Sequence, residues 1–241
     1  MNSFFKTISQ TKNYAENKKL LLEYLVKQGH DPEKFFSDDL RSLPDFGSLL
    51  DIEIASKRIV QAINKGEKIG LFGDYDADGT TSVALFYHFL KMLNVEAVTY
   101  QPSRFIEGYG LHKSSIETAL KDQIDLLITF DCGIMNHASA EYAQEVDLDL
   151  IITDHHNDGS KELPCAYAVV NPNRADQPES ELKKLAGVGV SFALAHEVKR
   201  NLGREMSSIY PLLQFAAIGT IGDMVPLNPM NLKIVRHGLK Q

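Results

Sequence analysis

The stretch KIGLFGDYDADGTTS, residues 68–82, decides the fold expected of this chain. It opens with the short apolar run Lys68–Gly73, and a helical pattern follows from about Thr81 to Leu93. A run that is almost continuously apolar is typical of a strand buried on both faces, as in a parallel sheet covered by helices. The stretch therefore predicts a buried strand that ends in an acidic turn and leads into a helix.

The same alternation of apolar runs and helical patterns continues toward the C-terminus. Further strands are predicted at Ala97–Gln101, Asp125–Phe130 and Leu148–Thr153, with a helix around Asn136–Val146. Strands that alternate with helices form βαβ units with right-handed crossovers. After the loop Asn171–Ser180, the pattern from Leu182 onward is mostly helical. We therefore predict an α/β fold with a parallel β-sheet flanked by helices.

The residues before the first strand predict helices. Apolar residues recur at helical spacing between Leu20 and Val26, and a second helix is expected over Leu50–Asn64. The expected organisation has three parts. They are a helical N-terminal extension over residues 1–65, the sheet domain over residues 66–230, and the start of a further helix over residues 231–241.

Composition indicates an ordinary globular protein, since 44% of the 241 residues are hydrophobic and 24% are charged. The net charge of −7 argues against a nucleic-acid-binding domain, because such domains are usually basic. The argument is weaker for an enzyme whose carboxylates hold divalent cations, because the bound ions restore positive potential locally. The two cysteines, Cys132 and Cys165, predict neither a disulfide framework nor a zinc ribbon, so we expect a reducing cytoplasm. No stretch has the apolar length of a membrane span or a signal peptide, so no membrane partner is expected.

Three aspartates, Asp74, Asp76 and Asp78, follow the first predicted strand at alternate positions. Carboxylates beside a buried strand are costly unless a cation or another partner compensates them. The alternative is a solvated turn or a helix N-cap, and capping by Asp78 is expected in any case. An EF-hand loop is excluded, because its twelfth position would fall within the apolar helix Val83–Leu90. We favour hard oxygen ligands for Mn²⁺ or Mg²⁺.

Further acids and histidines follow the other predicted strands. Asp131 follows the strand in TFDCG, and Asp154, His155 and His156 follow the strand in TDHH. Asp223 stands in the otherwise apolar segment IGTIGDMVP, near the end of a predicted helix. Each has a plain alternative, namely an N-cap for Asp131, a structural role for the histidines, and a helix C-terminal acid for Asp223. Because the carboxyl ends of parallel strands share one edge, the set together predicts a two-metal site for phosphoryl transfer.

These residues and several neighbouring stretches closely resemble the DHH phosphoesterase superfamily and, within it, the RecJ single-strand-specific exonucleases. The resemblance covers residues 68–241. It rests on GDYDADGTTS, PSRFIEGYGL, FDCGI, TDHH, VVNPNR, AGVGVSF and GTIGDMVPL. PSRFIEGYGL and GTIGDMVPL are the stretches that indicate the RecJ branch. The resemblance implies a DHH catalytic domain over residues 66–230.

The resemblance also implies a role for each site residue and two bound divalent metal ions, Mn²⁺ or Mg²⁺. Asp74 and Asp76 resemble ligands of one ion, and Asp131 resembles the carboxylate that bridges both. The second ion would be held by Asp78, His155 and Asp223. His156 resembles the residue that contacts the scissile phosphate, and Asp154 the residue that orients a histidine or a ligand. No side-chain nucleophile is then required, because a metal-activated water attacks the phosphodiester.

Five residues are implied or considered as contacts of the substrate. Arg104 suits bidentate phosphate contact and Tyr109 could stack on a base, although both also fit an ordinary surface loop. Ser82 belongs to the first metal motif. The backbone amides of Gly187 and Gly189 could hold a phosphate at the start of a helix, for which a plain glycine-rich helix entry is the alternative.

The implied function is that of the catalytic core of a 5′-to-3′ exonuclease that acts on the 5′ end of single-stranded DNA. The chain stops at Gln241, about where RecJ-like enzymes begin a connecting helix to a substrate-binding domain, so we expect that domain to be missing or separate. The alternatives are a phosphodiesterase for oligonucleotides or cyclic dinucleotides and a catalytically inactive binding protein. The full set of acids argues against the inactive protein, because buried acids without metals are costly.

Overall fold

The computed structural model describes residues 13–29, 31–105, 108–157, 159 and 162–241. The chain forms two compact units, Met1–Arg41 and Ser42–Gln241. The first contains the helices α2 (Tyr14–Lys27) and α3 (Pro32–Phe36). The Asn13 side chain accepts a hydrogen bond from the Ala15 amide and caps the start of α2. The predicted helix around Leu20–Val26 lies within α2, whereas the prediction for residues 1–12 lies outside the described residues.

The second unit is built on a five-stranded sheet in the order β2-β1-β3-β4-β5, in which every neighbouring pair is parallel. The strands are β1 (Ile69–Gly73), β2 (Ala97–Tyr100), β3 (Leu126–Phe130), β4 (Asp149–Thr153) and β5 (Ala168–Val170). All residues of β1 and β3 are buried, as their apolar composition predicts. The predicted α/β fold with a parallel sheet is therefore confirmed, and β5 is a strand that the sequence analysis missed.

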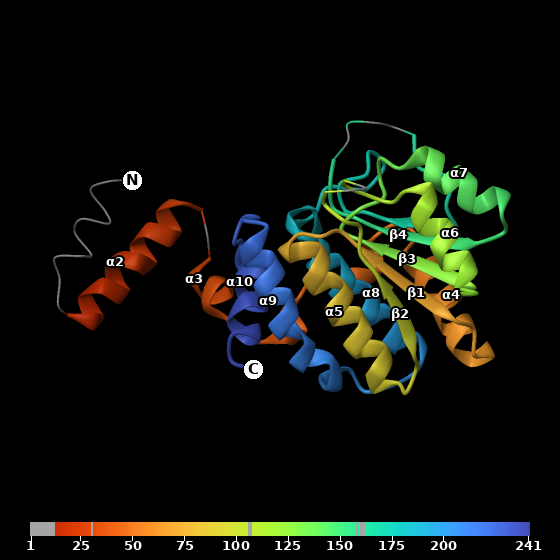
Figure 1. Cartoon of the computed structure of the whole chain (residues 1–241). Helices are drawn as coiled ribbons and strands as arrows, with labels where there is room; N and C mark the ends of the chain where they lie inside the picture. The colour runs from red at the N-terminus through yellow and green to blue at the C-terminus, as the bar shows by residue number, and fades with distance from the viewer. Residues whose placement is uncertain (1–12, 30, 106–107, 158, 160–161) are drawn as a thin grey trace. The chain divides into compact units, whose positions relative to one another are not determined.

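Helices cover both faces of the sheet (Figure 1). One face carries α6 (Lys113–Lys121) and α7 (His137–Glu145), which share an apolar core with Phe72, Leu127 and Ile152. The other face carries α4 (Ile52–Lys65), α5 (Ala77–Met92) and α8 (Gly187–Asn201). Their packing buries aromatic side chains, and the Phe86 ring lies 5.1 Å from that of Phe130 between centroids.

The C-terminal helices form a further layer on the second face. Helix α9 (Leu213–Gly222) packs against α5 and α8, and α10 (Pro229–Gly238) packs against α9. The Asn228 side chain caps α10 by accepting from the Asn231 amide at 2.9 Å. Short 3₁₀ helices complete the chain at Leu40–Ser42, Phe46–Ser48, Glu181–Lys184 and Met206–Leu212.

The division into units falls earlier in the chain than residue 65. Helix α4 belongs to the same compact unit as the sheet, and it buries Ile52, Ala55, Ile59 and Ala62 completely. It ends at Gly66, whose φ of 70° suits a glycine C-cap. Helix α10 begins at Pro229, two residues before the start predicted for the last part of the chain. Both helices therefore belong to the unit that contains the sheet.

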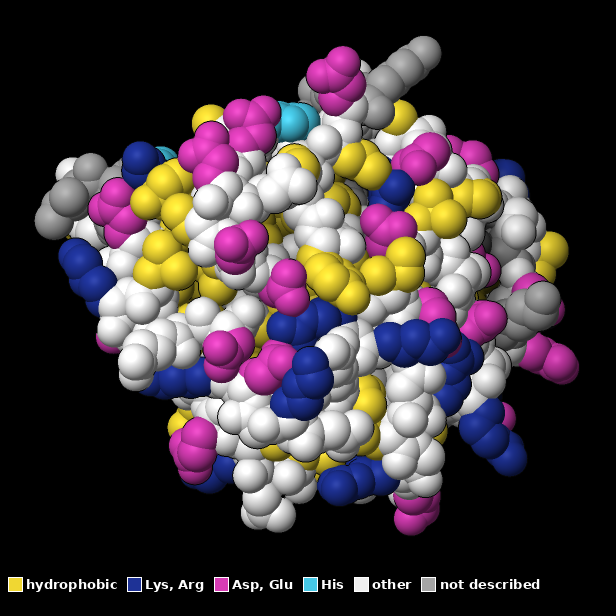
Figure 2. Space-filling view, turned by 90° about the vertical axis from the view of Figure 1, so that its right-hand side faces the viewer, with side chains coloured by type: hydrophobic (Ala, Val, Ile, Leu, Met, Phe, Trp, Pro, Cys, Tyr) yellow, Lys and Arg dark blue, Asp and Glu magenta, His cyan; other side chains and the backbone are white. Residues whose placement is uncertain are grey.

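Charged side chains of both signs are interspersed on the face shown in Figure 2, without a large field of a single sign. Histidine is visible there at the upper edge, next to acidic side chains. Across the described residues, every helix is too short or too polar to cross a bilayer.

Candidate metal centre

The strand order places the acidic residues where a parallel sheet binds its ligands. The chain leaves β1 toward β2 and leaves β3 toward β4, so it departs from these two neighbouring strands in opposite directions. Ligand sites of open parallel sheets lie at the carboxyl ends of such a pair. Asp74 follows β1 and Asp131 follows β3, and Asp154 follows the next strand, β4.

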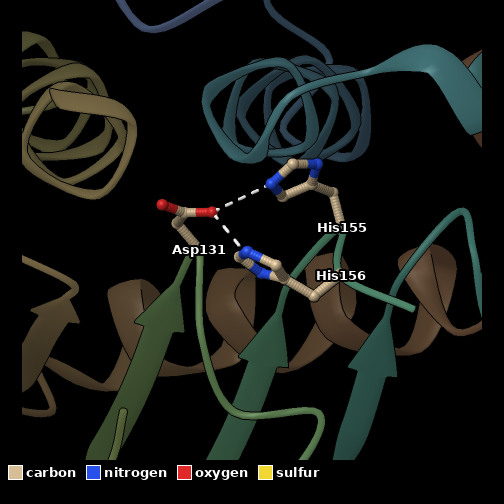
Figure 3. Close-up of side chains that lie close together, drawn as sticks. All are labelled: Asp131, His155 and His156. Atoms are coloured by element: carbon tan, nitrogen blue, oxygen red, sulfur yellow. Dashed lines mark ion pairs between the residues drawn. The ribbon is translucent and has the colours of Figure 1, made fainter. Parts of the chain in front are cut away.

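Asp131 lies between the two histidines of TDHH. Its Oδ1 is 3.2 Å from His155 Nε2 and 3.9 Å from His156 Nδ1. Figure 3 shows the carboxylate at the end of β3, with one oxygen directed toward both rings, which come from the loop after β4. The Asp131 side chain is only 1% exposed. The three residues offer ligand atoms that lie within 4.8 Å of one another.

A second group shares His155 with the first. His155 Nε2 lies 3.7 Å from an oxygen of Asp78 and 3.7 Å from an oxygen of Asp223. Asp78 is on the first turn of α5, and Asp223 directly follows α9. These three residues, which are far apart in the sequence, are those predicted to hold the second metal ion. Their ligand atoms also lie within 4.8 Å of one another.

Asp74 and Asp76 stand beside these groups rather than within them. The Asp74 side chain is buried, and its amide donates to the carbonyl of Phe130 at 3.3 Å, which ties it to the end of β3. Asp76 is exposed and caps α5 by accepting from the Gly79 amide at 2.9 Å. Burial raises the pKa values of Asp74 and Asp131, and the charge of Asp76 adds to both rises, so the three carboxylates interact electrostatically. The predicted assignment of Asp74 and Asp76 to one metal ion stays a prediction.

Asp154 holds the histidine loop in place. One carboxylate oxygen accepts from the amides of His155 at 2.7 Å and His156 at 3.0 Å, and it lies 2.8 Å from His156 Nδ1. The other oxygen accepts from the Ile134 amide at 3.0 Å. Asp154 is fully buried, and it contacts the group of Asp131, His155 and His156 through the two histidines. Its contacts fit the predicted role of orienting a histidine.

The pKa shifts reflect a concentration of buried charge. Burial raises the pKa of Asp131 to about 10, and the nearby charges of Asp78 and Asp76 add to the rise. Burial likewise raises the pKa of Asp78 to about 6, against the influence of His155. The hydrogen bond to Asp154 raises the pKa of His156 to about 9, despite burial of the ring. Carboxylates that resist ionisation at this site would be stabilised in the charged form by a cation.

Several buried atoms at the site have no hydrogen-bond partner among the described residues. They include Asp74 Oδ1, Asp131 Oδ1 and His155 Nε2. Buried polar atoms are nearly always satisfied, so each such atom requires an explanation. Carboxylate oxygen and imidazole nitrogen together are a donor set that suits Mn²⁺, and carboxylate oxygen suits Mg²⁺. The residues present therefore fit bound divalent cations.

The structure gives Gly187 and Gly189 a packing role, and the suggested phosphate contact stays a prediction. The Gly187 amide donates to Asp78 at 2.6 Å, so this N–H already has a carboxylate partner. A Cβ on Gly187 would lie 2.7 Å from Asp131 Oδ1, and one on Gly189 would lie 2.8 Å from the Leu185 side chain. Gly187 thus allows close packing against the Asp131 carboxylate, and Gly189 allows close packing against Leu185, because a larger side chain would displace these neighbours.

The other predicted substrate residues differ in exposure. Ser82 is fully buried on α5, which does not fit direct contact with a substrate. Tyr109 is half-buried, and its hydroxyl donates to the Asp131 carbonyl at 3.2 Å and lies 3.1 Å from His156 Nδ1. It therefore belongs to the support of His156. Arg104 is exposed, and its guanidinium carbon lies 5.1 Å from the ring centroid of Tyr75, beside the acidic turn.

Two asparagines that the sequence analysis left without a role contact the histidine loop. Asn171 donates to the carbonyl of His156 and Asn173 to that of His155. Both belong to the stretch VVNPNR, where two amide side chains directly follow a short apolar run. That composition was the available signal, but it does not reveal which backbone the amides reach.

Comparison with known proteins gives a consistent result. The single-stranded-DNA-specific exonuclease RecJ of Bacillus subtilis (strain 168) is 40% identical over 228 residues, which cover 92% of this chain and 28% of that protein. A crystal structure of exonuclease RecJ bound to manganese matches with a TM-score of 0.72 and 34% identity, over 80% of this chain and 48% of that one. The structure of RecJ from Thermus thermophilus in complex with Mn²⁺ matches with a TM-score of 0.72 and 29% identity, over 91% of this chain and 30% of that one.

The chain thus spans less than half the length of these relatives, whose names confirm the resemblance to RecJ exonucleases. Residues 68–220 match the model of the DHH family, N-terminal domain. The matched segment contains Asp74, Asp78, Asp131 and both histidines of TDHH, and it ends just before Asp223. Because the match extends over more than half of its residues, this chain belongs to the DHH family.

Proposed function

We propose that this chain contains the catalytic core of a metal-dependent phosphodiesterase that shortens single-stranded DNA from its 5′ end. The observation that carries this proposal is the group of Asp131, Asp78 and Asp223 around His155, with buried atoms that have no hydrogen-bond partner among the described residues. The relatives named as single-stranded-DNA-specific exonucleases support the substrate class. The RecJ structures bound to manganese support the cofactor.

Two divalent cations, Mn²⁺ or Mg²⁺, would be held by the acids and His155. Asp78, His155 and Asp223 would hold one ion, Asp74 and Asp76 the other, and Asp131 would contact both. When bound, such ions lower the pKa of a water molecule and stabilise negative charge on the phosphate. The Asp131 position supports this arrangement, because its Oδ1 lies within 4 Å of both histidine rings while its side chain is 1% exposed.

His156 would contact the scissile phosphate. Its Nδ1 is engaged by Asp154, which leaves Nε2–H to donate to a phosphate oxygen. The hydrogen bond to Asp154 raises the pKa of His156, which favours a protonated ring that would carry positive charge where the phosphate is negative. At 39% exposure, its side chain is also more accessible than that of His155, at 11%.

Substrate beyond the scissile phosphate would be contacted by Arg104. Its exposed guanidinium lies over the ring of Tyr75, and Tyr75 stands between Asp74 and Asp76 in the sequence. The guanidinium can form bidentate hydrogen bonds to a phosphate. The relatives are more than twice as long as the segment they share with this chain. We propose that a further substrate-binding domain, on the same chain or separate, helps to hold the strand. The free thiols of Cys132 and Cys165 fit a reducing cytoplasm as its location.

The test compares two aspartates with the same backbone conformation. Asp131 and Asp147 both have positive φ, 60° and 56°, and asparagine tolerates this conformation well. Asp147 is exposed just before β4, at the opposite end of the strand from the site. Asp131→Asn should lower the rate of Mn²⁺-dependent hydrolysis of 5′-phosphorylated single-stranded DNA at least about 100-fold. Asp147→Asn should leave that rate unchanged.

The same assay separates the remaining alternatives. Strands labelled at either end report the polarity of digestion, and a dinucleotide and a cyclic dinucleotide report activity on short substrates. Chelation with EDTA should abolish all cleavage. Cleavage by Asp131→Asn at the parental rate would disprove the metal assignment. Faster cleavage of the cyclic dinucleotide than of DNA would show that the substrate proposal is wrong, and binding of DNA without any cleavage would indicate an inactive binding protein.

A further inference from the structure

The histidine loop after β4 has no helix or strand of its own to fix it. Residues 154–157 lie outside regular secondary structure, yet His155 and His156 are the residues that reach Asp131. Their two N–H groups are held by Asp154, as described above. Fixing a peptide plane also requires control of its carbonyl, because the dihedral angles on either side can rotate. The partners of the two histidine carbonyls are therefore informative.

Each histidine carbonyl accepts one side-chain amide from the turn after β5. Asn171 Nδ2 donates to the His156 carbonyl at 2.9 Å, and Asn173 Nδ2 donates to the His155 carbonyl at 2.6 Å. The two asparagines are also joined, since Asn171 Oδ1 accepts from the Asn173 amide at 2.7 Å. Asn171 is fully buried. The peptide group between His155 and His156 is thus held at both its carbonyl and its N–H, the preceding one at its N–H and the following one at its carbonyl.

The asparagine contacts begin where strand pairing stops. The register of β4 and β5 ends at the pair Thr153 and Val170, and the Asp154 amide still donates to the Val170 carbonyl at 3.1 Å. One residue farther along each segment, the backbones no longer pair. The amides of Asn171 and Asn173 take over the connection between the two segments there.

The turn that carries the asparagines is itself anchored by a buried arginine. Arg174 Nη1 donates to Asp51 Oδ2 at 2.8 Å and to the Val169 carbonyl at 2.7 Å, and its amide donates to the Asn171 carbonyl at 3.3 Å. Asp51 directly precedes α4. The position of the turn is therefore set by β5 and α4, which are both rigid elements, rather than by the histidine loop itself.

We infer that Asn173 and Asn171 are positioning residues that fix the rings of His155 and His156, respectively, at the metal centre. The inference rests on the proposed function for its consequence in catalysis, although the ring positions can be measured without metal. In other metal sites, loss of a residue that hydrogen-bonds to a metal ligand and orients it lowers metal affinity or activity by about 10- to 100-fold. Because each asparagine contacts a different histidine, the two should affect different properties of the protein.

Replacement of an asparagine by aspartate at each of three positions tests the positioning role. Asn171→Asp keeps the oxygen that accepts from Asn173 and removes only the donor to His156, and Asn173→Asp removes the donor to His155. Asn157→Asp is the matched control, because this exposed residue adjoins the histidine pair and the change keeps its oxygen, which accepts from the Gly159 amide at 2.9 Å. All three variants add one negative charge. The variants Asn171→Ala and Asn173→Ala also remove the donor but add no charge.

The first measurement uses the full chain in EDTA, labelled with ¹³C and ¹⁵N at histidine. The rings of His155 and His156 lie 4.5 Å apart between centroids, so movement of either should change its NMR signals. We expect Asn173→Asp to shift the His155 signals and Asn171→Asp those of His156, each more than Asn157→Asp does. Equal shifts in the control and in the two variants would overturn the inference, whether or not the protein binds metal.

The second measurement separates binding from catalysis. Asn173→Asp and Asn173→Ala should weaken Mn²⁺ binding, followed by the EPR signal of the free ion, by about 10-fold or more. Asn171→Asp should lower kcat on single-stranded DNA by a similar factor and leave Mn²⁺ affinity within about twofold of the parent. A loss of thermal stability without this split would show a merely structural role and overturn the inference. If the parent binds no Mn²⁺, the proposed function fails, and the histidine signals still decide the role of the asparagines.

Discussion

At the scale of single residues, Asp131 combines an uncommon backbone conformation with a buried carboxyl group. Its φ of 60° is uncommon for a residue with a side chain and costs on the order of 1–3 kcal/mol. Its carboxylate is buried next to Asp78 and beneath Gly187, where a Cβ would lie 2.7 Å from its Oδ1. A fold that needed only a turn after β3 would be more stable with a neutral residue here. Binding of a cation by the carboxylate, as proposed above, would offset this cost.

Stability of the metal-free protein should fall as pH rises, and Asp131 should account for much of the fall. Its pKa is raised from 3.8 to about 10, so between these values the folded state holds a proton that the unfolded state has released. The pKa of His156 is raised from 6.5 to about 9, which acts in the same direction between these two values. Protons bound preferentially by the folded state stabilise it less as pH rises. For the buried Asp131, each pH unit is worth up to about 1.4 kcal/mol.

Thermal melting in EDTA between pH 6.5 and 9 measures this effect. The decline in Tm should be smaller in Asp131→Asn than in the parent, and Asp147→Asn should follow the parent. Added Mn²⁺ should displace the proton and bind more tightly as pH rises, so it should reverse the decline in the parent and in Asp147→Asn but not in Asp131→Asn. Parallel curves for the parent and Asp131→Asn would show that the carboxyl is not protonated in the folded state.

Residues that carry charge at a strand end could be predicted from the sequence, because their burial is costly without a partner. This reasoning predicts Asp78 and Asp131, whereas His155 is predicted from its place after a strand in TDHH and Asp223 from its unfavourable place near a helix end. The structure brings the four together. The role of Gly187 could not be predicted in the same manner, because a glycine at a helix entry fits both phosphate binding and close packing. The contact that distinguishes the two comes from Asp78, more than a hundred residues away in the sequence.

At the scale of elements, Asp78 joins two helices. It stands in the first turn of α5, and its two oxygens accept from the Gly187 amide at 2.6 Å and the Val188 amide at 2.9 Å. Helix α8 starts at Gly187 after Ala186, which offers no side-chain cap. The amides at the start of a helix need an acceptor and favour a negative charge. Asp78 is thus the cap of α8 as well as a predicted metal ligand.

Asp78→Ala and Asp223→Ala should therefore have different effects on stability. In EDTA, Asp78→Ala should lower the free energy of unfolding by about 1–2 kcal/mol, because it leaves two buried amides without an acceptor. Asp223→Ala should change it by less than about 0.5 kcal/mol, because Asp223 stands at the C-terminal end of α9, where the helix dipole disfavours an acid. Denaturant unfolding measures both values. Equal destabilisation by the two variants would contradict the capping role, whereas both should lose Mn²⁺ binding.

Elements with a clear period were predicted well, and elements without one were missed. The buried strands β1, β3 and β4 lie within predicted apolar runs. Strand β5 has only three residues and α6 is largely polar in sequence, so neither has enough apolar residues to reveal its period. Both are specified by packing instead. Helix α6 buries Ile116 and Ala119 against the sheet, and β5 pairs with β4.

At the scale of the whole molecule, the two compact units divide the chain between Arg41 and Ser42. The sheet, the helices that cover it and every residue of the candidate metal centre lie in the second unit. Helix α4 contributes four fully buried apolar side chains to that unit, among them Ile52 and Ile59. Its buried Arg58 also pairs with Asp149 at the start of β4, at 2.6 Å. The helix is therefore part of the core that supports the sheet.

Two truncated chains, one that keeps α4 and one that lacks it, should show whether the second unit needs this helix to fold. A chain of residues 42–241 should unfold cooperatively and keep a Tm increase on addition of Mn²⁺, because the sheet and the centre are complete within it. A chain of residues 66–241 should not fold cooperatively. Loss of Ile52 and Ile59 alone removes burial worth about 1.5–3 kcal/mol for each side chain, and Arg174 would lose its partner Asp51 as well. Calorimetry with and without Mn²⁺ measures both. If the shorter chain folded and bound Mn²⁺ like the longer one, the functional domain would begin near residue 66, and α4 would be an extension rather than part of the core.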